Sequence, residues 1–251
     1  MENHSGARKV LVPSQPTYLA WPGYFARLIQ ADQLVLMDDV QFVKHGWQNR
    51  NHIWDSVDGR RMLTIPVRMK GRFGQLIEDV EIAASGWERK HLSQITHAYP
   101  KLGQRGEAGE QVLQYYGHTF SHLREANEAF IDMVIRLLRL EVKVIRSSSL
   151  NVTGQKTDRL LDLCAKTGCN VMRVGPGALE YLDLPLIENS GVELEIVRTA
   201  SGESDADTEV DLSRLSIVDT LLRHGSNSRT MLERKYWFDK VLAPPMLERA
   251  I

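Results

Sequence analysis

The sequence is poor in cysteine, in long apolar runs and in excess charge of either sign. Its two cysteines, Cys164 and Cys169, are too few for a disulfide framework, and neither has Cys or His at metal-ligand spacing. Lys and Arg number 31 against 32 Asp and Glu, so bulk binding to nucleic acid or to an anionic membrane is not predicted. The polar N-terminus precedes an apolar run of only about four residues, too short for a signal peptide or a membrane span. We therefore expect a cytoplasmic protein with no membrane span and a frayed N-terminal tail.

A strand, helix and strand pattern opens the chain. Residues 9–13 and 33–38 read as buried strands, and about residues 23–30 read as a short helix between them. This is a βαβ unit, whose two strands should be parallel. Ligands of such sheets bind at the carboxyl ends of the strands. Residues 14–24 and 38–51 are therefore predicted to form one cleft.

The remaining patterns predict a single α/β domain over residues 1–251, with a parallel or mixed Rossmann-like sheet flanked by helices. A hairpin turn is expected at Asp58-Gly59, and further strands at residues 62–67, 76–82, 142–146, 169–174 and 192–198. Helices are expected before Pro100, over residues 106–140 with a break near Gly117, and from Thr157 to Gly168. Residues 84–140 would form a helical insertion. Residues 201–211 should be an acidic loop, and residues 212–222, 226–239 and 245–249 should be helical.

The loop after the first strand concentrates side chains that can hold a ligand. Pro16 fixes the backbone direction at the strand exit, and Pro22 suits the first position of the next helix. Helix N-termini attract phosphate or carboxylate groups, and an indole ring offers a surface for stacking. The alternative is that the aromatic side chains only fill the top of the sheet. The substrate-binding candidates here are Gln15, Tyr18, Trp21 and Tyr24.

Asp38 and Asp39 directly follow the second strand. Adjacent strand residues point to opposite faces, so one carboxylate should face the ligand while the other caps a turn. A carboxylate in this place can be a general base, a metal ligand or an acceptor for a sugar hydroxyl. Both are catalytic candidates, and the sequence does not choose between them. Gln41, in the same block, is a substrate-binding candidate.

The segment after Gln41 is the richest polar run of the chain. Arginine and lysine suit a phosphate or a carboxylate, and amide side chains orient hydroxyl or carbonyl groups. An ordinary solvated loop would carry more Glu, Ser and Lys. The substrate-binding candidates in this run are Lys44, Trp47, Gln48, Asn49, Arg50 and Asn51.

Three histidines bear on possible chemistry. His91 lies on a predicted helix with Trp87 and Lys90, and is a catalytic candidate because imidazole exchanges protons near neutral pH; a lone helical histidine is also often structural. His118 and His122 have the i, i+4 spacing of a metal pair. No third ligand accompanies them, so no metal site is predicted.

Two later segments also follow predicted strands. Lys156, Thr157 and Arg159 open a helix after a serine-rich loop, where amides, a lysine and a hydroxyl can hold an anion. The spacing of a P-loop is absent, and Thr157 as a plain helix cap is the alternative. Gly175 and Gly177 allow a ligand to approach the backbone closely, or form a simple turn. All five are substrate-binding candidates.

Three groups of motifs resemble the WbqC-like family of bacteria. They are QPTYLAWPGYF with DDVQF and WQNRN, then WERKHL with the later Tyr99, and then QKTDRLLDLCAKTG with VGPGALEYLD and LSIVDTLLRHG. The resemblance implies a setting in the biosynthesis of surface polysaccharides, modified sugars or specialised metabolites. Most members that we compare carry His before the Gln-Pro pair, where this chain has Ser14. If that His is a base in relatives, this chain uses a different base or has a different role.

These features favour a transferase that moves an acyl or aminoacyl group, for example from a carrier thioester, onto the amine of a sugar or related metabolite. No Ser or Cys nucleophile motif is present, so direct attack in a ternary complex is expected, with His91 or an Asp as the base. Asp38→Asn, Arg50→Ala and His91→Ala should each reduce turnover and leave the fold intact. The alternatives are a nucleotidyltransferase acting on a phosphorylated small molecule and a non-catalytic ligand-binding protein.

The expected partners follow from this hypothesis. They are a small-molecule or carrier-bound substrate, an acyl carrier protein as its bearer, and a second copy of the chain in a homodimer. The sequence identifies no cofactor.

Overall fold

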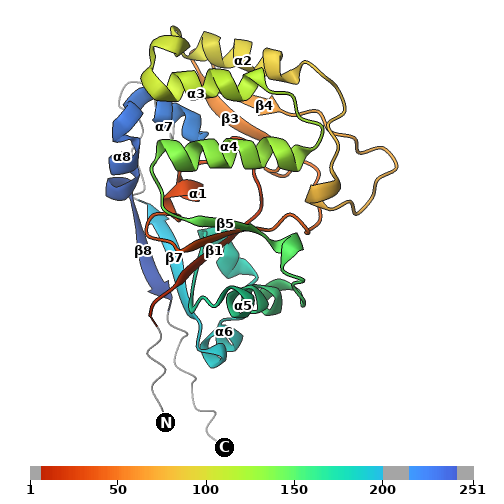
Figure 1. Cartoon of the computed structure of the whole chain (residues 1–251), viewed down its shortest axis with the longest axis vertical. Coiled ribbons are helices and arrows are strands. Elements are labelled where there is room, and N and C mark those ends of the chain that lie inside the picture. Colours follow the sequence, from red (N-terminus) through yellow and green to blue (C-terminus); the bar gives the residue numbers. More distant parts are fainter. Residues whose placement is uncertain (1–6, 200–214, 242–251) are drawn as a thin grey trace, which may run out of the picture.

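The computed structural model describes residues 7–199 and 215–241, and within them one sheet has the strand order β5-β2-β1-β6-β7-β8 (Figure 1). All neighbouring strands are parallel except β8, which runs antiparallel to β7. The strands are β1 (Val10–Ser14), β2 (Gln33–Leu36), β5 (Lys143–Arg146), β6 (Val171–Val174), β7 (Glu193–Thr199) and β8 (Tyr236–Val241). The predicted α/β class with a mostly parallel sheet is confirmed.

Helices cover both faces of the sheet. Because side chains alternate along a strand, Val10 and Val12 of β1 enter one hydrophobic cluster and Leu11 enters another. The first cluster contains residues of α1 (Pro22–Ala26) and α4 (Leu123–Leu137). The second contains residues of α5 (Lys156–Thr167) and α6 (Leu184–Ser190). Figure 1 shows α4 and α5 on opposite sides of the strands.

A further layer lies beyond α1 and α4. It contains the hairpin of β3 (Arg50–Asp55) and β4 (Gly59–Thr64), together with α2 (Trp87–Ala98), α3 (Gly106–Gly117), α7 (Ile217–His224) and α8 (Ser228–Lys235) (Figure 1). The predicted hairpin turn is confirmed, with Gly59 at a φ of 71°, which a glycine adopts without strain. Gly117 ends α3 and Gly168 follows α5, both as predicted. The interpretation of residues 84–140 as an insertion in a single domain stays a prediction.

Three predicted elements are wrong or shortened. Residues 76–82 are not a strand: they contain the 3₁₀ turn η1 (Ile77–Asp79) flanked by the single bridges Gln41–Leu76 and Val67–Ile82. Residues 236–239 are not helical, because β8 pairs there with the edge of β7. The first helix ends at Ala26 rather than near residue 30, and the N–H groups of Leu28 and Ile29 bind the carbonyls of Phe25 and Ala26, three residues back, as in a turn. The predicted acidic loop at 201–211 and helix at 245–249 lie outside the described residues.

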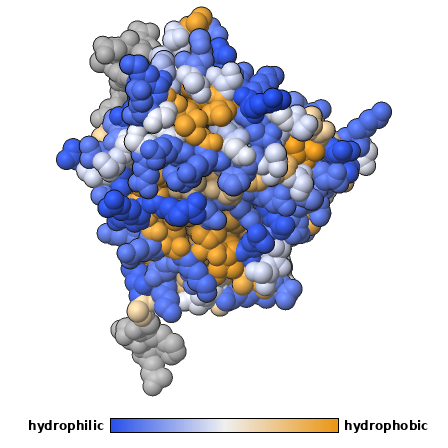
Figure 2. All heavy atoms as spheres, turned by 45° about the horizontal axis from the view of Figure 1, so that its top comes forward, coloured by the Kyte–Doolittle hydropathy of each residue, from blue (hydrophilic) through white to orange (hydrophobic). Residues whose placement is uncertain are grey.

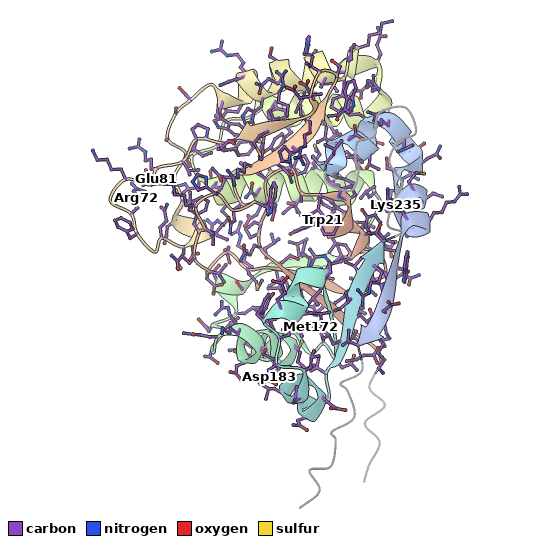
Figure 3. All side chains as sticks on the ribbon, turned by 180° about the vertical axis from the view of Figure 1, so that it is seen from behind. Trp21, Arg72, Glu81, Met172, Asp183 and Lys235 are labelled. Carbon is purple, nitrogen blue, oxygen red and sulfur yellow. The ribbon has the colours of Figure 1, made fainter. Side chains whose placement is uncertain are left out.

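The surface is mostly polar, and Figure 2 shows apolar side chains in separate patches on the face turned to the viewer. A loop projects between β4 and η1 and carries Phe73, which is fully exposed. Arg72 and Glu81 form an ion pair of 2.8 Å at this loop (Figure 3). Within the described ranges, none of the helices has the length and apolar character needed to cross a lipid bilayer.

Candidate functional site

The sheet has a topological switch point between β1 and β6. The chain passes from β1 to β2 on one side of this point and from β6 to β7 on the other. In α/β sheets, ligands bind at the carboxyl ends of the strands at such a point. A pocket of about 740 Å³ lies there, lined by Ser14 from the end of β1 and by Val174 and Gly175 from the end of β6. Figure 3 shows Trp21 between the hairpin and the sheet at this place.

The pocket lining combines aromatic rings, hydroxyls and cationic groups. No lining residue in the described part of the chain is Asp or Glu. The pocket is therefore suited to a ligand that is partly flat and carries negative charge. The lining residues are Pro13, Ser14, Gln15, Thr17, Trp21, Tyr24, Arg27, Met37, Trp47, Asn51, His52, Arg60, Leu160, Val174, Gly175, Pro176, Gly177, Ala178 and Tyr181.

The Trp-Pro-Gly sequence at the start of α1 sets the position of Trp21. Pro22 occupies the first turn of the helix, where its missing N–H costs nothing. The indole of Trp21 lies over Gly23 so closely that an added Cβ there would be 1.9 Å from the ring atom Cζ3. Trp21 also packs edge-on against Tyr236, with ring centroids 6.3 Å apart. Gly23 is therefore needed to keep the indole in the pocket wall.

Two hydroxyl groups of the pocket have no hydrogen-bond partner among the described residues apart from each other. They are the Oγ of Ser14 and the phenol oxygen of Tyr24, and both residues are buried. Burial raises the pKa of Tyr24 above its ordinary value, and the charge of Arg27 and the nearby hydroxyl of Ser14 offset only part of this rise. The phenol is therefore neutral at neutral pH and can donate a hydrogen bond to a ligand.

The β3-β4 hairpin contributes an imidazole and a cation to the opposite wall. His52 packs edge-on against Trp47, with ring centroids 5.9 Å apart, and Arg60 lies on the facing strand. Burial lowers the pKa of His52, and the charges of Arg60 and Arg50 lower it further. His52 is therefore neutral at pH 7 and can accept a proton.

The two loops predicted to share a cleft are tied together by their own side chains. Gln48 donates to the side-chain oxygen of Gln15 over 2.8 Å, and Asn51 donates to the carbonyl of Leu19 over 2.8 Å. Asn127 of α4 donates to the carbonyls of Pro16 and Gln48 over 3.0 and 2.8 Å. Gln48 and Asn127 therefore hold the loops beside each other, and Gln15 and Asn51 reach the pocket.

The structure places Asp38 and Asp39 outside the pocket lining. Asp38 is fully buried and accepts hydrogen bonds from the backbone N–H and the hydroxyl of Ser148, over 3.0 and 2.8 Å. Asp39 accepts a hydrogen bond from Ser147 and pairs with Arg159 over 2.6 Å. Partial burial raises the pKa of Asp39, but the bonds from Arg159 and Ser147 outweigh it, so the pKa is lowered. Both carboxylates hold the 3₁₀ turn η3 (Ser147–Ser149) at the ends of β2 and β5.

His91 and Tyr18 also lie away from the pocket, in a buried network. The phenol of Tyr18 contacts His91 Nδ1 at 2.8 Å and the phenol of Tyr116 at 2.6 Å. Burial lowers the pKa of His91 to about 4, although a hydrogen bond with the backbone of Thr64 acts in the opposite direction. A neutral imidazole that donates to Thr64 accepts at Nδ1, so Tyr18 donates to His91 and Tyr116 donates to Tyr18.

The other candidates divide between pocket, scaffold and surface. Trp47, Gly175 and Gly177 line the pocket with Gln15, Trp21, Tyr24 and Asn51. Asn49 donates to the carbonyl of Ile65 over 2.9 Å, and Arg50 binds the carbonyl of His45. Thr157 accepts from the backbone N–H of Asp183 over 2.9 Å. Gln41, Lys44 and Lys156 are exposed and do not line the pocket.

Comparison with known proteins shows the family of this chain. The model of the WbqC-like protein family matches residues 15–231. The chain belongs to the WbqC-like protein family. A protein of Mycobacterium tuberculosis (strain ATCC 25618 / H37Rv), named "Uncharacterized protein Rv1507c", is 28% identical over 170 residues, which cover 67% of this chain and 73% of the relative. No solved structure matches the chain significantly.

The family match adds one detail about the pocket of this WbqC-like protein. It begins at Gln15, so Ser14 lies immediately outside it. Ser14 occupies the position where a histidine was expected from the resemblance, and it lines the pocket. In the pocket, His52 is the histidine that can take a proton.

Several lining residues of the WbqC-like pocket were not predicted from the sequence. Arg27 is the most informative, because it lies between the apolar residues Tyr24, Phe25 and Leu28 and is itself only 7% exposed. A lone arginine inside an apolar segment was the available signal. His52 and Arg60 could not be found in this way, because hairpin residues alternate between faces and only the folded chain shows which face meets the pocket. The other missed lining residues with polar side chains are Ser14, Thr17 and Tyr181.

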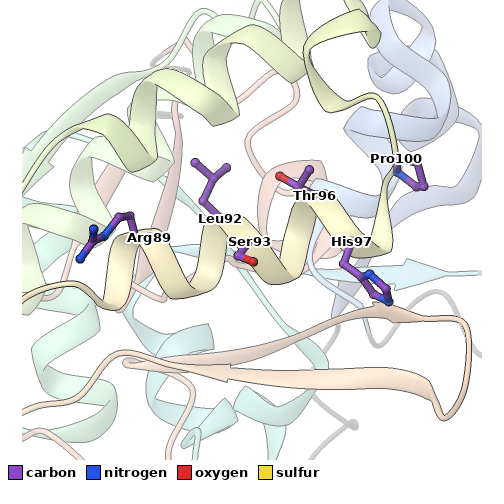
Figure 4. A pocket seen from close by; sticks show the side chains of 6 residues that line it. All are labelled: Arg89, Leu92, Ser93, Thr96, His97 and Pro100. Atoms are coloured by element: carbon purple, nitrogen blue, oxygen red, sulfur yellow. The ribbon is translucent and has the colours of Figure 1, made fainter.

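A second hollow, of about 630 Å³, lies along α2 and is not the candidate site. Figure 4 shows its lining residues Arg89, Leu92, Ser93, Thr96, His97 and Pro100. The hollow is open to solvent, and none of these residues carries an unpartnered buried polar atom. Within the described residues, no three His, Cys, Asp or Glu side chains gather as metal ligands would, and His122 instead caps the start of α4.

Proposed function

We propose that this WbqC-like protein is a transferase that moves an acyl or aminoacyl group onto an amine in the pocket at the β1-β6 switch point. The observation that carries the proposal is that the neutral imidazole of His52 shares this pocket with two buried hydroxyls and aromatic rings. The volume of about 740 Å³ is in the usual range for small-molecule sites. The substrate class follows the family's expected setting in polysaccharide, modified-sugar or specialised-metabolite biosynthesis.

The proposed reaction needs a general base, an oriented thioester carbonyl and a pocket from which water is excluded. The amine nitrogen attacks the thioester carbonyl, the C–N bond forms, and the thiolate leaves. His52 removes the proton from the attacking nitrogen and returns it to the thiolate. Arg60, on the facing strand of the hairpin, can donate a hydrogen bond to the carbonyl oxygen as negative charge develops there. Trp21 and Trp47 offer flat surfaces for the substrate and limit the entry of water.

The test is an assay for thiol release. The full chain is incubated with acetyl-coenzyme A and with nucleotide-linked amino sugars, thiol release is followed with a chromogenic reagent, and products are identified by mass spectrometry. Background reaction of the protein should be low, because burial raises the pKa of Cys164 to about 12 and both cysteines are buried. Thiol release that depends on the amine supports the proposal.

The variant His52→Gln identifies the base. It should lower kcat by about 10²- to 10⁴-fold, the range for loss of a general base, while the exposed His97→Gln on α2 should keep full activity. Because the pKa of His52 is lowered, the midpoint of the fall in wild-type kcat at acid pH should lie below the ordinary histidine pKa of 6.5. Equal activity of His52→Gln and His97→Gln would refute the assignment.

Two other outcomes correspond to the alternative functions. Release of pyrophosphate from ATP or CTP, without thiol release, would indicate nucleotidyl transfer to a phosphorylated small molecule. Saturable binding of nucleotide sugars without any product would indicate a non-catalytic ligand-binding protein. The absence of lining carboxylates in the described pocket favours binding of an anionic ligand under all three functions.

A further inference from the structure

Arg27 is a buried cation that reaches the pocket from the end of α1. It directly follows the helix Pro22–Ala26, is only 7% exposed and contributes to the pocket lining. Its guanidinium carbon lies 5.2 Å from the ring centroid of Tyr24, so the ring covers one side of the group. Arg27 lines the pocket together with Ser14 and Tyr181.

No carboxylate neutralises this cation within residues 7–199 and 215–241. Arg27 forms no ion pair there, and its buried Nε has no hydrogen-bond partner. Glu195 is already occupied, because its two oxygens bind Arg173 and Arg8. Burial lowers the pKa of Arg27 and the adjacent charge of Arg173 lowers it further, while Tyr24 and Tyr181 offset part of this decrease. Among the described residues, no carboxylate contributes to this compensation.

Unpaired buried charges are rare because desolvation of an ion costs several kcal/mol. The same pocket also holds the buried hydroxyls of Ser14 and Tyr24, which have no partner among the described residues except each other. One group that brings negative charge and several oxygen lone pairs could accept from the Nε of Arg27 and from both hydroxyls. Carboxylates and phosphates are such groups, and arginine binds them through two parallel N–H donors.

We propose that Arg27, Tyr24 and Ser14 form an oxyanion subsite that binds a carboxylate or phosphate group of the substrate. The proposal deepens the transferase hypothesis by naming the charge class of the substrate, but it rests on the shared pocket and not on the transfer reaction. Arg60, which is exposed at the hairpin, provides a second positive charge at the same pocket.

Arg173 is the positioning residue for this subsite. Its Nη1 donates to the carbonyls of Arg27 and Ile29 over 2.9 and 2.6 Å, which fixes the backbone that carries Arg27. Its own charge is held by Glu195 over 2.8 Å and lies against the ring of Phe238 at 3.7 Å. Arg173, which is paired with Glu195, thus holds the backbone of Arg27 at the pocket, and Arg27 itself has no ion pair among the described residues.

The test measures anion binding by isothermal titration at constant ionic strength, with inorganic phosphate and acetate as separate probes. Wild-type protein should bind one of them with 1:1 stoichiometry, and the tighter probe assigns phosphate or carboxylate as the group recognised. Arg27→Gln should weaken that binding at least tenfold, and Tyr24→Phe should weaken it severalfold. The matched control Arg89→Gln, which removes an exposed charge on α2 away from the pocket, should change it less than threefold.

The outcomes separate this inference from the transferase proposal. Arg27→Gln should fold at least as stably as wild type because it removes a buried charge, and circular dichroism checks this. Loss of fold in Arg27→Gln but not in Arg27→Lys, with anion binding kept by Arg27→Lys, would still support the subsite. No binding of either probe by wild type, or equal weakening by Arg27→Gln and Arg89→Gln, would overturn it. Anion binding without any transfer would support the subsite and refute only the reaction.

Discussion

At the scale of single residues, the fold separates side chains that look equally functional in the sequence. Gln15, Trp21 and Tyr24 line the pocket, whereas Tyr18 in the same loop is completely buried against His91. The identities of these residues indicate that a loop binds something, but they do not indicate which way each side chain turns. The direction of each side chain depends on the elements packed around it, and these come from distant parts of the chain. Arg27 was missed for the same reason.

Asp38 provides a residue-scale prediction that separates structure from catalysis. Its oxygens accept two hydrogen bonds from Ser148, and Arg124 lies 3.5 Å away. Asp38→Asn replaces one acceptor oxygen by a donor, so we expect a loss of about 1–3 kcal/mol in the free energy of unfolding, the usual cost of unsatisfied buried groups. Urea denaturation measures it, with Asp58→Asn at the exposed hairpin turn as the control.

The activity of the folded Asp38→Asn protein decides its role. The structure predicts unchanged turnover per folded molecule, since Asp38 does not line the pocket. The sequence predicted the opposite, reduced turnover with an intact fold. A stable Asp38→Asn variant with strongly reduced kcat would therefore show that Asp38 acts in catalysis.

At the scale of elements, the sequence predicts those whose pattern is local and fails where pairing is distant. The strand β1, the hairpin and the helix breaks after Gly117 and at Gly168 all have local signals, and they were predicted close to their observed positions. The alternating residues 76–82 found no neighbouring strand, and their backbone N–H groups bind loop carbonyls such as those of Val40 and Asp38. Residues 236–241 form a strand because they pair with β7.

The buried network of His91 links α2 to β4 and to the loop after β1, and it predicts how stability depends on pH. The folded-state pKa is about 4, below the ordinary value of 6.5, so between these values the unfolded chain binds a proton that the folded chain does not. This contribution is fully present above pH 6.5 and is lost as the pH falls towards 4. It amounts to about 3 kcal/mol at most.

Urea denaturation between pH 4 and pH 8 tests this linkage. The free energy of unfolding of His91→Gln should depend less on pH in this window than that of wild type, and the exposed His97→Gln should follow wild type. Identical slopes for His91→Gln and wild type would show that His91 is not held neutral by the fold.

At the scale of the whole molecule, the sheet order locates the pocket. The sequence placed the site at the ends of β1 and β2, and the order β5-β2-β1-β6-β7-β8 places the switch point between β1 and β6. Strand order cannot be read from one sequence. The strands β1 and β6 are neighbours in the sheet but lie far apart along the chain, and no local pattern indicates that they pair. The loops after β1 and β2 do meet, yet the third wall comes from Gly175 to Tyr181. These residues also lie in the segment matched to the WbqC-like family.

The most direct test of this account is to block the pocket without disturbing the fold. A Cβ added at Gly177 or at Gly117 meets no atom within 4 Å, but only Gly177 lines the pocket. We predict that Gly177→Leu and Gly117→Leu both fold, with melting temperatures within a few degrees of each other. Binding of phosphate or acetate, measured by titration calorimetry, should be lost in Gly177→Leu and kept in Gly117→Leu. Full binding by a folded Gly177→Leu protein would contradict the assignment of this pocket as the ligand site.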